Sequence, residues 1–339
     1  MDRTFFATMP LVRLVLTGLV FATALVGAPG EPINGSDVSD NSQQATALNA
    51  TPLAGPHRPA NVPEGYVITP FGYFHTSCLQ SLSKGERLLA DGKVQHANGS
   101  VNASVAVCGY PHYLRSGMAA NTANARSSPE IDGWVESASI TTGSADKSYG
   151  ALIATWTVPS QPYRDDGQVL YLFPGFEDIN GVQSILQPVL GWYQGRWTIA
   201  SWNCCLNGIV TNSPAVAVTT GDKIYGSITN SCPPGTHACP AWSVLSVDLS
   251  TGDSTTLGNT PSNGQAFNWA FGGVLEAYYI NSCDDYPSDR QLTFSQVTIF
   301  DQNLHPLATQ KWSAGVDSSD TPQCGYGLTL MKRKITVAY

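Results

Sequence analysis

From Gly133 to its end, the chain is a succession of short apolar runs separated by turn-forming residues such as Thr220-Gly221-Asp222. Each run has about the length of a β-strand, and no stretch shows a convincing 3.6-residue helical period. The pattern predicts an all-β domain over residues 133–339, built as an antiparallel sandwich, jelly roll or barrel. The predicted strands are residues 150–158, 168–173, 184–190, 196–202, 215–219, 223–229, 242–249, 269–280, 291–300 and 306–312.

The composition is that of a globular β-rich protein. Only 12% of the residues are charged and 42% are hydrophobic, so the chain can bury a large core. The 25 acidic residues outnumber the 17 basic residues, which gives a formal net charge of −8. A negatively charged protein is poorly suited to bind the negatively charged phosphate backbone, so we expect no binding of nucleic acid.

Residues 1–28 have the pattern of a secretory signal peptide. Arg3 gives a charged start, and the apolar run from Leu11 to Val26 is interrupted only by Arg13. The alternative is a membrane anchor, but the run is shorter than the ~20 residues that a transmembrane helix needs. We therefore predict a secreted, extracellular, monomeric protein that leaves the membrane when the signal is cleaved.

Secretion makes disulfide bonds the expected state of the cysteines. Cys78 and Cys108 are alone in the N-terminal third, so we expect them to pair. Cys283 and Cys324 flank one C-terminal block and are expected to pair for the same reason. The eight cysteines are Cys78, Cys108, Cys204, Cys205, Cys232, Cys239, Cys283 and Cys324.

The four central cysteines leave their pairing open. Adjacent cysteines pair only with strain, so Cys204 and Cys205 could instead reach Cys232 and Cys239. A zinc site is the rival interpretation, but the sequence has no CxxC pair and His237 is the only histidine nearby. We therefore expect no metal and no cofactor.

Two further segments follow the signal peptide. Residues 29–62 are rich in Asn, Ser, Ala, Thr and Pro, which indicates a flexible leader. Residues 63–128 form a small cysteine-bearing unit that ends in a linker-like stretch. Sequons for N-glycosylation also fit a secreted chain. They begin at Asn34, Asn49, Asn98 and Asn102.

Two polar residues inside apolar strands are candidates for catalysis. Gln187 shares a strand face with Val189, and Glu276 shares one with Val274 and Tyr278. Burial raises the pKa of a carboxyl and suits it to acid–base catalysis, while a neighbouring amide can donate to an oxyanion. The alternative interpretation is that both are solvent-side residues of their strands. No nucleophile elbow, zinc-protease motif, phosphate loop or dinucleotide fingerprint offers other chemistry.

Several short motifs occur in an order and spacing that resemble the eqolisin glutamic peptidases, and more distantly the neprosin-like peptidases. The resemblance covers about residues 150–312. The motifs are Thr155-Trp156-Thr157-Val158-Pro159, Ile185-Leu186-Gln187, Trp197-Thr198-Ile199-Ala200-Ser201-Trp202, Thr220-Gly221-Asp222-Lys223-Ile224, Leu249-Ser250-Thr251-Gly252-Asp253 and Leu275-Glu276-Ala277-Tyr278.

The resemblance implies a concanavalin-like β-sandwich whose concave face carries a catalytic Gln and Glu, here Gln187 and Glu276. It implies an acid-acting endopeptidase with a polypeptide substrate, an activated water and no metal. The two side chains should then face one another within reach of a shared water. Aromatic residues of the same strands are candidates for the cleft walls or, alternatively, for the core. They are Trp197, Trp202, Tyr278 and Trp269.

Two other classes of protein fit the same pattern. A carbohydrate-active enzyme would use a carboxylate pair such as Glu177 and Glu276, at ~5–5.5 Å or ~6.5–9.5 Å. A non-catalytic lectin-like protein would use its eight tryptophans and fourteen tyrosines to stack on sugars. A Gln187 side chain beside Glu276 favours the peptidase, and Glu177 there favours the glycosidase. The N-terminal third lies outside the resemblance and is either an activation propeptide or a permanent accessory domain.

Overall fold

The computed structural model describes residues 58–89, 93–102, 107–120, 133–144, 146–181, 184–205 and 208–339. The predicted signal peptide, the sequons at Asn34 and Asn49 and most of the predicted leader lie outside these residues. All described residues belong to one compact unit, Ala45–Tyr339. Within the described ranges, no helix combines the length and hydropathy that crossing a bilayer requires.

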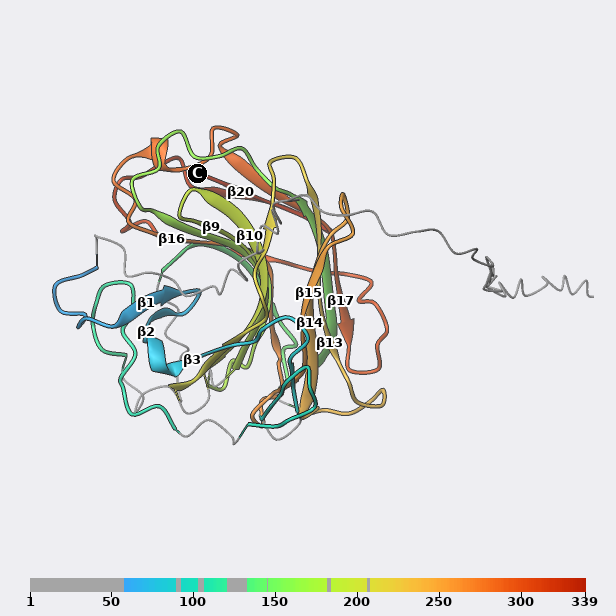
Figure 1. Ribbon diagram of the computed structural model, residues 1–339. Helices are drawn as coiled ribbons and strands as arrows, with labels where there is room; N and C mark the ends of the chain where they lie inside the picture. Colours follow the sequence, from blue (N-terminus) through green and yellow to red (C-terminus); the bar gives the residue numbers. More distant parts are fainter. Residues whose placement is uncertain are drawn as a thin grey trace, which may run out of the picture. The chain divides into compact units, whose positions relative to one another are not determined.

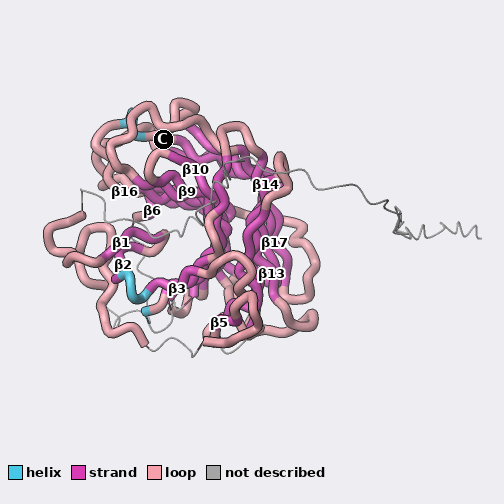
Figure 2. The backbone as a smooth tube through the Cα atoms, viewed as in Figure 1, coloured by secondary structure: helices cyan, strands magenta, loops and turns pink. Residues whose placement is uncertain are grey.

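Two β-sheets packed face to face dominate the fold (Figures 1 and 2). The first sheet has nine strands: β3 (Leu79–Ser81), β6 (Trp134–Thr141), β8 (Val169–Glu177), β9 (Ser184–Tyr193), β10 (Arg196–Cys205), β11 (Val210–Asn212), β12 (Val216–Val218), β16 (Trp269–Tyr278) and β18 (Ser313–Val316). Their order is β18-β6-β16-β8-β9-β10-β11-β3, with β12 paired to β10. All these pairs are antiparallel except β11 with β3.

The second sheet has seven strands in the order β15-β14-β13-β7-β17-β20-β19. They are β7 (Tyr149–Thr157), β13 (Lys223–Asn230), β14 (Ala241–Asp248), β15 (Ser254–Pro261), β17 (Gln291–Asp301), β19 (Gly327–Met331) and β20 (Lys334–Ala338). The arrangement is the antiparallel β-sandwich that the sequence predicts, so the fold class is confirmed.

The N-terminal segment adds small elements that pack on the sandwich. β1 (Tyr66–Thr69) and β2 (Gly72–His75) form a hairpin, and η1 (Thr76–Cys78) leads from it into β3. A shorter hairpin, β4 (Arg87–Leu88) with β5 (Val94–Gln95), buries side chains in the inter-sheet core. Because β3 extends the first sheet, this segment shares its packing with the sandwich.

The first sheet turns one face toward the second sheet and the other toward the β1–β2 hairpin. On β8, Leu172 and Phe176 lie in the core between the sheets. Tyr171 and Phe173 alternate with them and join a second apolar cluster together with residues of the hairpin. In Figure 1 the sheet bends around the hairpin, so we call this side the concave face.

A β-bulge in β16 sets which of its side chains reach the concave face. The register with β8 shifts between Phe271 and Val274, which inserts one extra residue. Gly273 occupies the bulge, where an added Cβ would lie 2.5 Å from Phe294 Cδ2 of the opposite sheet. The extra residue reverses the alternation, so Glu276 faces the same side as Phe271.

Four disulfides stabilise the described part of the chain: Cys78–Cys108, Cys204–Cys205, Cys232–Cys239 and Cys283–Cys324. The first and last are the two pairs expected from the sequence. The alternative in which Cys204 and Cys205 reach Cys232 and Cys239 is wrong. The physical reason is the topology: the adjacent cysteines end a strand of the first sheet, whereas the other two close a loop between strands of the second.

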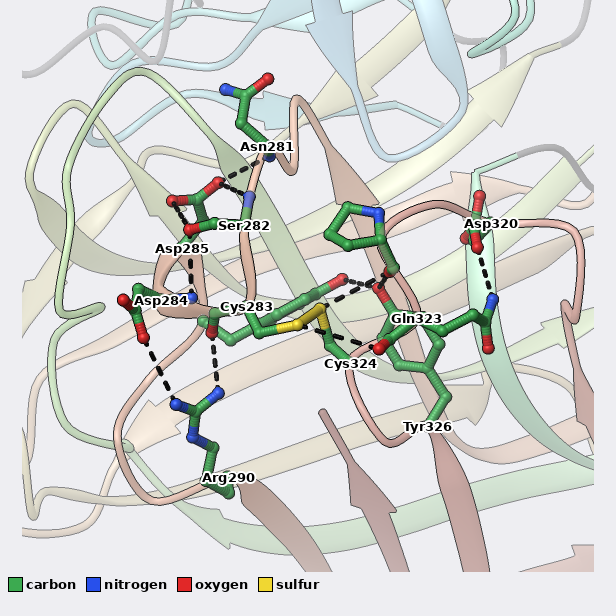
Figure 3. Close-up of a disulfide and its surroundings, with 12 residues drawn as sticks. Asn281, Ser282, Cys283, Asp284, Asp285, Arg290, Asp320, Gln323, Cys324 and Tyr326 are labelled. Atoms are coloured by element: carbon green, nitrogen blue, oxygen red, sulfur yellow. Dashed lines mark hydrogen bonds and ion pairs between the residues drawn. A yellow bond between two sulfur atoms is a disulfide. The ribbon is translucent and has the colours of Figure 1, made fainter.

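The Cys283–Cys324 bond holds the loop that follows β16 (Figure 3). The loop contains the short helix η3 (Cys283–Asp285). A capping box formed by Ser282 and Asp285 closes its N-terminus, with both reciprocal hydrogen bonds present. The Ser282 hydroxyl accepts from the first turn, and the Asp285 carboxylate accepts from the Ser282 N–H at 2.9 Å. This network fixes the end of the strand that carries Glu276.

The strand predictions need correction: one predicted strand is absent, and β6, β11, β15, β18, β19 and β20 were not predicted. Residues 306–312 do not form a strand: only an isolated bridge joins Phe300 to Pro306, and β18 begins at Ser313. Pro306 lacks the N–H that a ladder needs. The polar strand β15 was not predicted, because it forms the edge of its sheet and carries few of the apolar residues that identify a buried strand.

Candidate active site

Gln187 lies in β9 and points to the concave face. Its strand neighbours Leu186 and Leu190 belong to the inter-sheet core, whereas Val189 belongs to the concave cluster. On β10 it pairs with Trp202, which is also part of that cluster. The side chain is fully buried, and neither Oε1 nor Nε2 has a hydrogen-bond partner among the described residues.

Glu276 lies in β16 on the same face and is also fully buried. The Tyr278 hydroxyl donates to Glu276 Oε1 at 2.5 Å. Burial and the neighbouring Glu276 charge raise the pKa of Tyr278 well above its ordinary 10.0, so the phenol keeps its proton. Gly133, at φ +97°, leaves room for both groups: an added Cβ would lie 3.2 Å from Glu276 Oε1 and 3.1 Å from the Tyr278 hydroxyl.

The strand β8 separates the two candidates. Glu276 pairs with Tyr171 of β8, and the Gln187 Cγ lies 3.4 Å from where a Cβ on Gly175 would stand. Positions 171 and 175 are about 13 Å apart along a strand, and the two flanking strands are about 10 Å apart. The two backbone positions are therefore about 16 Å apart across the sheet. The shared-water contact itself stays a prediction.

Glu177 ends β8 on the concave face, where it pairs with Trp269. It is fully buried, and neither carboxylate oxygen has a hydrogen-bond partner in the described part of the chain. Burial raises its pKa to about 8. Positions 177 and 171 are about 20 Å apart along β8, so Glu177 and Glu276 are too far apart for a pair of glycosidase carboxyls.

The four aromatic candidates divide between the two faces. Trp202 and Tyr278 are buried in the concave cluster, and the half-buried Trp269 packs against it. Trp197 does not line a cleft as expected, because it lies in the inter-sheet core, where it packs edge-on against Trp192. Its odd separation from Trp202 along one strand turns it to the opposite face.

The β1–β2 hairpin covers the concave face. The Phe71 ring packs edge-on to Trp202, with 6.4 Å between the ring centroids. The Tyr73 ring packs edge-on to Tyr278 at 6.0 Å, and its hydroxyl lies 2.7 Å from the Tyr279 hydroxyl. The hairpin therefore covers the aromatic side chains beside Gln187 and Glu276.

Two residues of the site were missed in the sequence. Tyr171 lies between the candidates, and its hydroxyl donates to the Ile68 carbonyl of the hairpin at 3.4 Å. The sequence did offer a signal for Tyr171: it lies two residues from Phe173 in the predicted strand 168–173, so both side chains point to the same face. Gly133 had no such signal, because its role depends on the fold. Among the described residues, no group of three or more His, Cys, Asp or Glu side chains could hold a metal ion.

No protein-family model matches the sequence, and no curated protein matches it. Scytalido-glutamic peptidase, crystallised with a peptide-based transition state analog, shares 16% identity at a TM-score of 0.44, covering 61% of this chain and 98% of that one. SCP-B, a member of the eqolisin family in complex with the tripeptide Ala-Ile-His, gives the same identity and coverage and a TM-score of 0.42. Aspergilloglutamic peptidase from Aspergillus niger shares 18% identity at 0.32, covering 50% and 98%. Similarities of this size leave the function to be judged from the chain's own residues.

Proposed function

We propose that this protein is a secreted glutamic endopeptidase that hydrolyses peptide bonds at acid pH. The observation that carries the proposal is the presence of two buried polar side chains on the concave face. One buried carboxyl and one buried amide, Glu276 and Gln187, stand on the two strands that flank β8. Gln187 has no hydrogen-bond partner among the described residues, and Glu276 is a buried carboxyl that accepts from Tyr278, so this pair is the best candidate for chemistry. The disulfides support secretion.

Glu276 is the general base and then the general acid. Its carboxylate takes a proton from a water molecule, and the water oxygen attacks the peptide carbonyl carbon. The C–N bond then breaks, and Glu276 returns the proton to the leaving nitrogen, which departs as an amine. The Tyr278 hydrogen bond supports the carboxylate form in which the cycle begins.

Gln187 stabilises the oxyanion that forms on the carbonyl oxygen. The Nε2–H group is a neutral donor in a water-poor site, where one such hydrogen bond is worth ~10²–10³ in rate. An amide is suited to this task because it does not titrate between acid and neutral pH.

The N-terminal segment is a removable cover in this proposal, as expected of an activation propeptide. Its hairpin fills the face that a substrate must occupy, and the Arg115 guanidinium forms an ion pair with Asp320 at 2.8 Å.

The test is hydrolysis of a denatured protein by the full chain between about pH 2 and 7, beside Glu276→Gln. The wild type should cleave at the acid end, and N-terminal sequencing should show the loss of residues up to about 128. Glu276→Gln should bind the same substrate without cleaving it. Wild-type protein that is folded, has lost its N-terminal segment and still cleaves nothing would contradict the proposal in favour of a binding protein.

A further inference from the structure

The mechanism leaves one question about Gln187 open, namely which end of its amide faces the substrate. Only the Nε2–H end stabilises an oxyanion, because Oε1 would repel it. The side chain must therefore be held in one of two orientations that differ little in shape. Apart from the Trp202 indole N–H, its own strand and β10 offer no polar group for this on the concave face. The neighbours there are Ile185, Val189, Ala200, Trp202 and Cys204.

The polar side chain that β8 offers next to Gln187 is Glu177. The Gln187 Cγ lies over Gly175 of β8, and Glu177 stands two residues further along the same side of that strand, about 7 Å away. Because Gly175 has no side chain, nothing from β8 separates the two groups. Both are fully buried, and in the described residues neither Glu177 oxygen nor either Gln187 amide atom has a hydrogen-bond partner.

We propose that Glu177 is a positioning residue, which donates a hydrogen bond from its protonated carboxyl to Gln187 Oε1 and so turns Nε2–H toward the substrate. The proposal rests on the proposed function of Gln187. The two residues are diagonal neighbours on adjacent strands, a separation that long side chains can span. The bond would satisfy two buried groups at once.

The protonation state of Glu177 supports this role. Burial raises its pKa to about 8, so at acid and neutral pH the group is a carboxylic acid with one O–H to donate. A carboxylate could not donate and would instead attract the Nε2–H end, which would present the wrong face of the amide to the substrate.

The test compares two substitutions. Glu177→Gln keeps a neutral donor, so kcat should stay within about threefold of the wild type. Glu177→Leu removes the donor, so kcat should fall by about 10–100-fold, less than the loss of the whole oxyanion donor. KM should change little, because the substrate's own contacts remain. The melting temperature should not fall, since an apolar group replaces a buried polar group without partners.

Glu136 is the matched control. It is a second buried carboxyl with a pKa raised by burial to about 8, but it accepts from the Ala338 N–H and lies at the inter-sheet side. Glu136→Leu should leave kcat per folded molecule unchanged. If the leucine variant does not fold, Glu136→Gln serves as the control variant instead. Equal losses in the Glu177 and Glu136 variants would mean a merely structural effect and would overturn the proposal.

A second readout does not need activity. In protein labelled with ¹⁵N-glutamine, the Gln187 side-chain NH₂ resonances are those absent from Gln187→Ala. Glu177→Leu should shift them strongly, while Glu177→Gln should shift them little. Unchanged resonances in Glu177→Leu would refute the hydrogen bond whatever the activity. Shifted resonances in a protein that cleaves no peptide would instead refute the proposed function and leave the contact standing.

Discussion

Buried polar side chains on the two faces of the nine-stranded sheet can be compared residue by residue. On the inter-sheet face, the Asn203 amide donates to Thr260 at 2.6 Å and to the Pro261 carbonyl at 2.9 Å. On the concave face, Gln187 and Glu177 have no hydrogen-bond partner within the described residues. Polar groups with partners specify the fold, whereas those without them are available to a ligand. The comparison assigns a structural role to the Asn203 Nδ2 group and leaves the Gln187 amide available for chemistry.

Glu276→Gln should produce the largest effect. Without the Glu276 carboxylate, the attacking water has no base, so kcat should fall by about 10⁴-fold while circular dichroism remains unchanged. Glu136→Gln removes a carboxyl on the other face and should retain wild-type kcat. A similar loss in both variants would break the distinction between the faces.

Gln187→Ala should lower kcat by about 10²–10³-fold, because it removes one oxyanion donor. The matched substitution on the inter-sheet face is Asn203→Ala, which should instead lower the free energy of unfolding by about 1–3 kcal/mol with little change in kcat per folded molecule. Steady-state kinetics and urea unfolding of both variants measure the contrast. A stability loss in Gln187→Ala as large as that in Asn203→Ala would contradict it.

The free energy of unfolding should fall as pH rises from about 4.5 toward 8. Burial raises the pKa of Glu136 and of Glu177 from 4.5 to about 8, so the folded state holds two protons that the unfolded state has released. The stability that this gives is complete below pH 4.5 and is lost as pH rises through 8, at up to ~1.4 kcal/mol per pH unit for each group. Urea unfolding at several pH values should show a shallower slope in Glu136→Gln and in Glu177→Gln. An unchanged slope in either variant would mean that its carboxyl ionises normally.

Gly133→Ala should lower kcat less than Glu276→Gln and Gln187→Ala do, and it should also cost stability. The residue has φ +97°, and an added Cβ would press on Glu276 Oε1 and the Tyr278 hydroxyl. Backbone strain should lower the free energy of unfolding by about 1–3 kcal/mol. Gly143→Ala has the same kind of backbone, at φ +72°, with nothing within 4 Å, and is the control. Only Gly133→Ala should lower kcat, and equal kcat in the two variants would remove Gly133 from the site.

Much of the sandwich could be predicted because a strand leaves a period-2 pattern in the sequence. The same alternation predicted the face to which Gln187 and Glu276 each point, from the apolar residues two positions away on the same strand. The predicted face of Glu276 is correct despite the bulge, because Val274, Glu276 and Tyr278 all follow the bulge in the chain and no extra residue interrupts their alternation. Parity was also sufficient to separate Trp197 from Trp202, which had been assigned to the same cleft.

Other features depend on contacts between distant parts of the chain. The predicted strand 168–173 stopped before Glu177, since Pro174 and Gly175 resemble a turn, yet β8 continues through them with every residue buried. The contact of Phe71 with Trp202 joins segments far apart in the sequence, and no local pattern encodes it. The same holds for the pairing of Cys204 with Cys205, where eight cysteines allow many arrangements.

The most direct test of the central claim is a double-variant cycle on the acid-treated full chain. It compares kcat for the wild type, Gln187→Ala, Glu276→Asp and the double variant. Two groups that act on one tetrahedral intermediate are strongly non-additive. Gln187→Ala should therefore cost much less in the Glu276→Asp background than its ~10²–10³-fold in the wild type. If the two losses instead multiply, as they should for Gln187→Ala combined with Glu136→Gln, then Gln187 and Glu276 do not work as one catalytic pair.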